Sequence, residues 1–167
     1  HTLKRYGMTK NEVSAITRFR SAEFINQRDG DGLDIVLAKT ISGFSDYLEE
    51  QVPDLVVVHG DRVEALAACM VCATKYIRCA HIEGGEVSGT IDEILRHCNS
   101  KLAYCHFVSS QTAARRVQAL GEDDSSIHVI GSPELDIHGQ PSGFTLQDVL
   151  SHYEIRTADY GICILHP

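Results

Sequence analysis

Three carboxylates are the side chains in this sequence best suited to chemistry. Asp61 follows a β-branched apolar run, Glu83 follows the next apolar run, and Asp92 ends the glycine-rich stretch 81–92 that contains Glu83. Carboxylates that share one cleft raise one another's pKa, as general acid–base catalysis requires. The three acids therefore predict a site for proton transfer, with residues 81–92 as its central loop.

Each acid also has a purely structural interpretation to be weighed against the catalytic one. Asp61 and Glu64 match a capping box, in which Asp61 would only begin a helix. Asp92 falls in the first turn of a predicted helix, where the helix dipole favours an acid and Arg96 follows one turn later for an ion pair. Glu83 has no such explanation, because it ends a strand directly before two glycines.

The elements that must position these acids alternate along the chain. Apolar runs predict strands at residues 54–59, 76–81, 104–108, 127–130 and 160–165. Helices are predicted at residues 8–26, 34–52, 91–102, 110–120 and 145–153, with another after Arg62. Thr90 with Glu93 forms a predicted capping box that starts the helix at Ile91. Alternating strands and helices are typical of βαβ units, so we predict an α/β fold with a doubly wound parallel sheet.

Residues that follow the strands of such a sheet converge on one edge. The converging set comprises His59–Arg62, residues 81–92, Ser109, Ser110, residues 131–133 and His166. Helix N-termini at the same edge offer backbone N–H groups and a positive dipole end, which suit an anion such as a phosphate.

The composition excludes several other classes of function. The net charge is −8 and no basic block occurs, so neither a nucleic-acid surface nor a membrane surface is expected. No apolar run approaches the ~20 residues of a membrane span. The sequence contains no G-x-G-x-x-G fingerprint, P-loop lysine, G-x-S-x-G elbow or zinc-ligand spacing, which disfavours NAD, Walker-type ATP binding and a metal cofactor.

The six cysteines lie mostly in apolar strands or small-residue helices, where a free thiol behaves as a small hydrophobe. Cys69 and Cys72 have C-x-x-C spacing, but no second ligand pair follows at zinc-ribbon distance. Buried packing is therefore the expected role, in a reduced, cytoplasmic protein.

The predicted site resembles that of a known family, the hydrolysing UDP-N-acetylglucosamine 2-epimerases, which include bacterial sialic-acid biosynthesis enzymes. The matching residues are His59–Arg62, the run His-Ile-Glu-Gly-Gly-Glu-Val-Ser-Gly-Thr-Ile-Asp at 81–92, Arg96, His97, Lys101, Gly131–Pro133, Asp136 and the closing His166–Pro167. The resemblance extends over nearly the whole chain. It implies a GT-B type epimerase, in which residues 1–167 form a single Rossmann-like N-terminal domain. This domain would be incomplete at both ends, with its first strand and the C-terminal nucleotide-binding domain absent.

The family reaction is an elimination followed by a hydration. A base removes the C2 proton of the sugar while UDP leaves C1, and water then adds with inversion at C2, giving N-acetylmannosamine and UDP. By resemblance, Asp61, Glu83 and Asp92 are the acid–base carboxylates. The implied substrate-binding residues are Arg62, Gly84, Gly85, Glu86, Ser88, Ser132 and His166, with His166 at the phosphate or leaving group and the two glycines close to the sugar. The resemblance also implies a homo-oligomer without a metal or other cofactor.

Four alternatives stay open from the sequence. The substrate could be a UDP-2,4-diacetamido sugar, or the enzyme could be the non-hydrolysing epimerase that returns UDP-N-acetylmannosamine. A glycosyltransferase would share the GT-B fold but would need an acceptor other than water. Residues 1–167 alone are expected to bind UDP weakly and to be inactive, so a non-catalytic nucleotide-sugar-binding fragment is the fourth.

Overall fold

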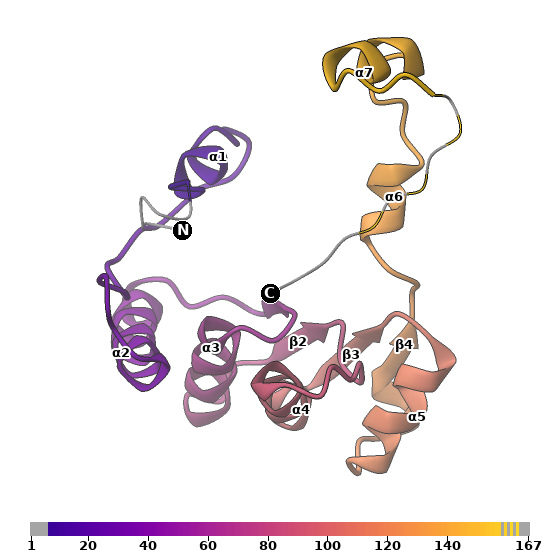
Figure 1. The fold of residues 1–167 in the computed structure, drawn as a ribbon. Coiled ribbons are helices and arrows are strands. Elements are labelled where there is room, and N and C mark those ends of the chain that lie inside the picture. Colours follow the sequence, from indigo (N-terminus) through magenta and orange to yellow (C-terminus); the bar gives the residue numbers. More distant parts are fainter. Residues whose placement is uncertain (1–6, 158, 160, 162, 164–167) are drawn as a thin grey trace. The chain divides into compact units, whose positions relative to one another are not determined.

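A computed structural model of the chain describes residues 7–157, 159, 161 and 163 (Figure 1). The chain divides into two compact units, residues 1–132 and 133–167. The second unit contains two short helices, α6 (Glu134–His138) and α7 (Leu146–His152), and α7 begins with a capping box. The strand predicted at 160–165 falls largely outside the described residues, and His166 lies wholly outside them.

The first unit is built on a four-stranded parallel sheet. Its strands are β1 (Val56–His59), β2 (Cys79–Ile82), β3 (Cys105–Val108) and β4 (Ile127–Val129), and they lie side by side in chain order. This confirms the predicted parallel α/β fold. Each described strand lies on the outer side of the strand before it. The strand order of the described residues therefore does not reverse direction, as it does in a doubly wound sheet.

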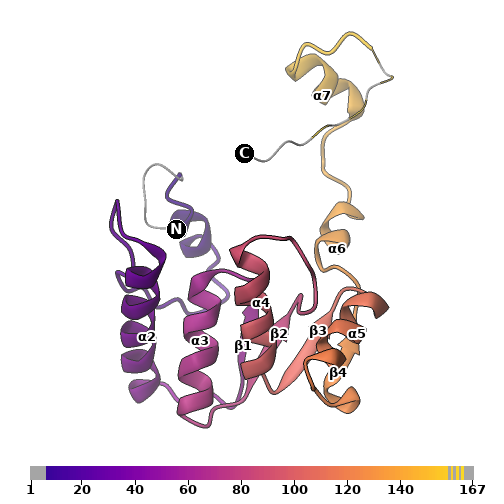
Figure 2. The same ribbon diagram turned by 60° about the horizontal axis from the view of Figure 1, so that its bottom comes forward.

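Four helices accompany the strands. They are α2 (Leu33–Glu50), α3 (Val63–Thr74), α4 (Ile91–Leu102) and α5 (Gln111–Ala119), and a 3₁₀ turn, η2 (Asp124–Ser126), precedes β4. Figures 1 and 2 show α3, α4 and α5 on one face of the sheet, with α2 packed beside α3. Helices in this arrangement direct their N-termini toward the edge where the strands end, so the turns after β1 and β2 meet the start of α4.

The helix predicted over residues 8–26 is wrong in extent. Only α1 (Lys10–Ser14) is helical, and the following residues form turns and irregular structure. The apolar side chains that suggested a long helix, including Val13, Ile16 and Phe19, are exposed. A helix has only marginal stability unless it buries an apolar face against the rest of the protein. Because these apolar side chains are exposed, the periodic pattern alone did not produce a long helix.

Small thiols fill the core between α3 and the sheet. Cys69, Cys72 and Cys79 are buried around Val58, and the Cys69 and Cys79 sulfurs lie 3.8 Å apart. The contact with Cys69 raises the pKa of Cys79 to about 12, and contact with Cys79 together with burial raises that of Cys72. The structure thus confirms buried packing for the C-x-x-C pair, because reactivity requires an accessible thiolate.

This core makes a prediction about thiol chemistry. In the folded gene product, iodoacetamide should leave Cys69, Cys72 and Cys79 unmodified, because all three thiols are buried and inaccessible. Peptide mass spectrometry with and without urea measures this directly. Labelling of these three thiols at the same rate in both conditions would contradict the packing described here.

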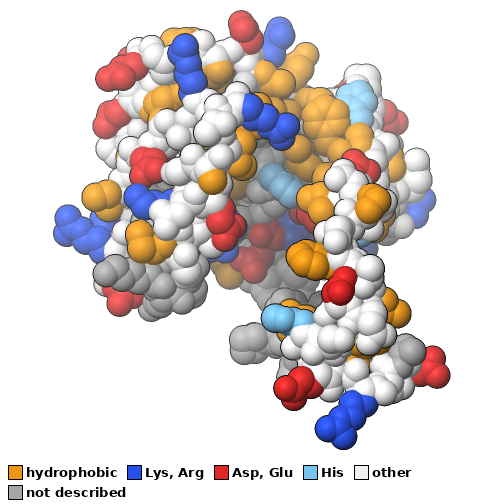
Figure 3. Space-filling view, turned by 90° about the horizontal axis from the view of Figure 1, so that it is seen from above, with side chains coloured by type: hydrophobic (Ala, Val, Ile, Leu, Met, Phe, Trp, Pro, Cys, Tyr) orange, Lys and Arg blue, Asp and Glu red, His pale blue; other side chains and the backbone are white. Residues whose placement is uncertain are grey.

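Among the described residues, no helix combines the length and apolar character needed to cross a membrane. Lys and Arg side chains lie scattered among Asp and Glu on the face drawn in Figure 3.

Candidate active site

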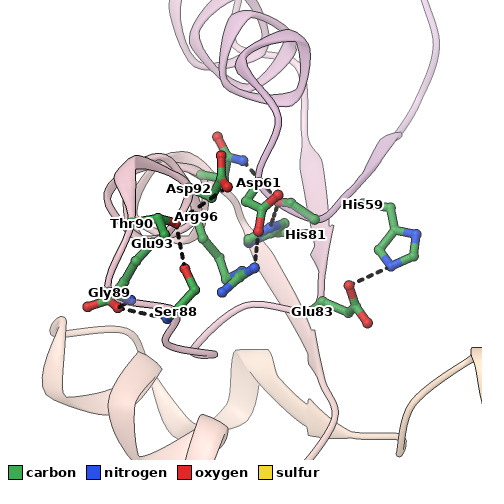
Figure 4. Close-up of polar contacts among 12 residues, drawn as sticks. His59, Asp61, His81, Glu83, Ser88, Gly89, Thr90, Asp92, Glu93 and Arg96 are labelled. Carbon is green, nitrogen blue, oxygen red and sulfur yellow. Dashed lines mark hydrogen bonds and ion pairs between the residues drawn. The ribbon is translucent and has the colours of Figure 1, made fainter. Parts of the chain in front are cut away.

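Asp61 is held by an ion pair across the edge of the sheet. It follows β1, and its carboxylate pairs with the guanidinium of Arg96 from α4, both side chains being largely buried (Figure 4). Two structural interpretations are therefore wrong. Arg62, not Asp61, is the N-cap of α3, and Arg96 pairs with Asp61 rather than with Asp92. The sheet register brings Asp61 to α4, which local spacing does not reveal.

Glu83 has the backbone conformation least expected of its residue type. Its φ is +67°, a region that non-glycine residues rarely occupy, and such conformations concentrate at functional sites. Its N–H donates to the carbonyl of Phe107 at 2.9 Å, which fixes the strained residue to β3. Its carboxylate lies 2.9 Å from Nε2 of His59, at the end of β1. Sequence reasoning assigned His59 no chemical role, since its place in the pattern is that of a strand end.

The two glycines after Glu83 are required by packing. A Cβ at Gly84 would lie 2.7 Å from the Ser100 hydroxyl oxygen, and one at Gly85 would lie 2.2 Å from the carbonyl oxygen of Ala113. Gly85 also has φ +80°, which side chains disfavour. Both glycines are buried. The close approach seen here is that of the loop to α4 and α5, and the expected approach of the two glycines to the sugar stays a prediction.

A buried histidine fixes the residue before Asp61. His81 is fully buried, with Nε2 2.8 Å from the carbonyl oxygen of Gly60 and Nδ1 3.0 Å from the hydroxyl of Ser100. Asn99 donates to the same carbonyl at 3.1 Å. Because a carbonyl only accepts, Nε2 of His81 carries the proton and Nδ1 accepts from Ser100. Burial lowers the pKa of His81 to about 4, so the ring stays neutral near pH 7.

This histidine predicts an acid-sensitive fold. The pKa of His81 is about 4 in the folded chain against an ordinary 6.5, so the unfolded chain binds the extra proton and stability falls as pH drops through this range. The loss should approach ~3 kcal/mol of unfolding free energy. Burial lowers the pKa of His106 too, so that residue adds to the same trend. The free energy of unfolding, measured in urea between pH 7 and pH 4, should fall less for His81→Gln than for the wild type. An equal fall in both proteins would refute this role of His81.

The acidic loop before α4 is organised by Glu93. Its carboxylate accepts backbone N–H bonds from Gly89 at 2.7 Å and Ser88 at 2.8 Å, which lower the pKa of Glu93. The predicted capping box is wrong: Thr90 is the N-cap, but its side chain makes no bond to the helix backbone, and Glu93 reaches the two residues before it. The Ser88 hydroxyl lies 3.0 Å from that of Thr90.

Other candidate residues have contrasting surroundings. The Glu86 carboxylate accepts from the Ser109 hydroxyl, which ties the loop to the end of β3. The Arg62 side chain is 80% exposed and lies 3.7 Å from the carboxylate of Glu64. Ser132 is half-buried at the end of the first unit.

Two of the three acids line one cavity. It measures about 170 Å³, and both Asp61 and Asp92 line it, together with Arg62. Glu83 does not line this cavity. It pairs with His59, and Figure 4 shows the Glu83–His59 pair apart from the Asp61–Arg96 pair. The edge of the sheet thus carries a cavity with two carboxylates and, apart from it, a carboxylate–imidazole pair that can exchange a proton.

Comparisons with known proteins show which family this chain belongs to. The sequence matches the family model described as UDP-N-acetylglucosamine 2-epimerase over residues 1–167. It is 40% identical over 167 residues to the UDP-N-acetylglucosamine 2-epimerase of Neisseria meningitidis serogroup B, across 100% of this chain and 44% of that protein. It is 36% identical over 168 residues to the UDP-N,N'-diacetylbacillosamine 2-epimerase (hydrolyzing) of Legionella pneumophila, across 97% of this chain and 44% of that protein.

A solved structure shows the same fold. The crystal structure of UDP-GlcNAc 2-epimerase from Neisseria meningitidis bound to UDP-GlcNAc aligns with a TM-score of 0.69 and 22% identity, over 89% of this chain and 39% of that one. This confirms the expected fold class, a Rossmann-like half of a GT-B type enzyme. The chain spans less than half the length of these relatives.

Proposed function

Because the chain belongs to the UDP-N-acetylglucosamine 2-epimerase family, we propose that the complete protein hydrolyses UDP-N-acetylglucosamine to N-acetylmannosamine and UDP. The observation that carries the proposal is the group of Asp61, Glu83 and Asp92 at the carboxyl edge of the sheet, in a chain matched by the family along its whole length. We place the activity in the cytoplasm and in sialic-acid biosynthesis, in a homo-oligomer without nucleic-acid or membrane partners.

The chemistry requires groups that accept and return protons. In the first step the C2 proton passes to a carboxylate while the C1–O bond to UDP breaks, leaving a glycal. In the second step water supplies a hydroxyl to C1, and a proton is delivered to C2 on the opposite face. Asp61, Glu83 and Asp92 are the proposed acid–base groups. The bonds to Gly60 and the ion pair with Arg96 hold Asp61 in position before substrate arrives, which supports catalysis by orientation.

The leaving group needs positive charge. Arg62 is exposed at the N-terminus of α3, where the helix dipole is also positive, so it is the proposed diphosphate contact in this unit. The remaining proposed substrate contacts are Gly84, Gly85, Glu86, Ser88, Ser132 and His166. The two glycines would act through their backbone, since their Cα positions face protein.

The proposed release of a free sugar and the proposed identity of that sugar are supported by different relatives. The name of the Legionella relative includes the word hydrolyzing, which favours release of the free sugar. That relative is also named for a diacetylated sugar, so UDP-2,4-diacetamido sugars are the second candidate substrates. We rank UDP-N-acetylglucosamine first because the identity to the Neisseria enzyme is the higher of the two.

The test uses the complete gene product with each UDP-sugar in H₂¹⁸O. Free N-acetylmannosamine should appear together with UDP, with the label at C1 of the sugar and none in UDP, because C1–O cleavage directs water to the sugar. UDP-N-acetylmannosamine without UDP would indicate the non-hydrolysing reaction. Product formation only in the presence of an added acceptor would indicate a transferase, and either result would overturn the proposal.

A further inference from the structure

Helix α5 holds the loop that follows Glu83. The guanidinium of Arg116, on this helix, donates from Nη1 to the carbonyl oxygen of Gly85 at 3.1 Å. Arg116 lies three residues after Ala113, whose own carbonyl oxygen leaves no room for a Cβ at Gly85. Residues three apart share a helix face, so one face of α5 both supports Gly85 and binds its backbone.

The loop of residues 84–89 is tied at both ends. At its far end the carboxylate of Glu93 binds the N–H groups of Ser88 and Gly89. At its near end the bond from Arg116 to Gly85 has a charged donor, and such bonds are stronger than bonds between neutral groups. The loop is therefore ordered from two helices, α4 and α5, on either side of its central residues.

The backbone at Gly85 requires such a bond to keep one orientation. Two consecutive glycines have no side chains to restrict them, and Gly85 has φ +80°. A peptide group is planar and trans, so the direction of the Gly85 carbonyl also fixes the direction of the Glu86 N–H. By binding that carbonyl, Arg116 determines how Glu86 leaves the glycine pair.

We propose that Arg116 is a positioning residue for the epimerase reaction, which acts by holding the Gly85–Glu86 peptide in the orientation that the substrate requires. The inference rests on the proposed function, in which Glu86 and Ser88 contact the substrate. Arg116 acts on the substrate through the loop of residues 84–89, from the α5 side.

Loss of this bond should weaken substrate binding rather than slow the chemistry. A bond with a charged donor changes the ratio of two loop conformations by about 10–100-fold. The apparent affinity falls with the fraction of protein in the competent conformation, whereas bound substrate selects that conformation. KM should therefore rise while kcat stays close to the wild-type value. A merely structural defect would instead reduce the amount of folded enzyme and lower kcat at an unchanged KM.

The test measures UDP release by the complete gene product. Arg116→Met should raise KM at least about tenfold and change kcat by less than about twofold. Arg116→Lys retains a donor for the carbonyl and should recover most of the wild-type KM. Arg115→Met is the matched control, because Arg115 is exposed on the same helix and bonds the hydroxyl of Thr112 at 3.2 Å. An unchanged KM for Arg116→Met, a fall in kcat alone, or an equal effect of Arg115→Met overturns the proposal.

Amide hydrogen exchange tests the same bond without turnover. In Arg116→Met the N–H groups of Ser88 and Gly89 should exchange at least about threefold faster than in the wild type, because the loop opens more often. Arg115→Met should leave their exchange unchanged. Equal exchange in the wild type and Arg116→Met overturns the inference whatever the kinetics show. A wild type that releases no UDP would overturn the proposed function, and exchange alone would then decide whether Arg116 orders the loop.

Discussion

Replacing Glu83 by Gln in the complete enzyme is expected to reduce UDP release by roughly 10²–10⁴-fold while the fold survives. The amide has nearly the shape of the carboxylate but cannot accept a proton, and the partly exposed side chain leaves no buried charge behind. The positive φ of residue 83 is unaffected, since Gln has the same backbone preferences as Glu. UDP release and thermal melting, measured together, separate chemistry from stability.

Two further substitutions sharpen this expectation. Asp61→Asn should also abolish UDP release, but it leaves the buried guanidinium of Arg96 without its ion partner and so should lower stability as well. Glu49→Gln is the matched control, because Glu49 pairs with Lys75 on the surface, away from the site. Near-normal turnover in the Glu83 or Asp61 variant would remove that residue from the acid–base set.

Gly85→Ala should destabilise the protein by more than ~3 kcal/mol. The new Cβ would lie 2.2 Å from the carbonyl oxygen of Ala113, and backbone on both sides has little room to move. Gly89→Ala is the natural control in the same loop. Gly89 has φ +69°, and no atom lies within 4 Å of the position that a Cβ would take, so only the conformational cost of about 1 kcal/mol remains. Urea unfolding measures both variants, and equal losses would show that backbone conformation alone, rather than contact with α5, requires glycine.

The sequence predicted local structure better than it predicted the partners of the site residues. The helix expected over 91–102 is α4 as observed, since an N-cap and a strong helical period agree there. The β-branched run before His59 likewise became a strand. The helix over 8–26 failed because propensity was not supported by packing.

The contacts of the site depend on residues far apart in the chain. The structural interpretation of Asp92 paired it with Arg96 one turn away, yet the sheet brings Asp61 to Arg96 instead. The Glu83–His59 pair and the bond from His81 to Gly60 both cross between β1 and β2. Such contacts are set by strand register, which a periodic pattern does not encode. A histidine at each of two neighbouring strand ends was the one signal that could have drawn attention to them.

The chain-order arrangement of β1 to β4 bears on how the protein is made. Every strand pairs with the strand that precedes it in the sequence, so no described pairing waits for a distant segment. During synthesis each new strand and helix can therefore dock on the part that has already left the ribosome, and the sheet can grow stepwise. The edge that carries Asp61 and Glu83 would then be assembled once β3, which holds the backbone of Glu83, has emerged, and before the C-terminal unit exists.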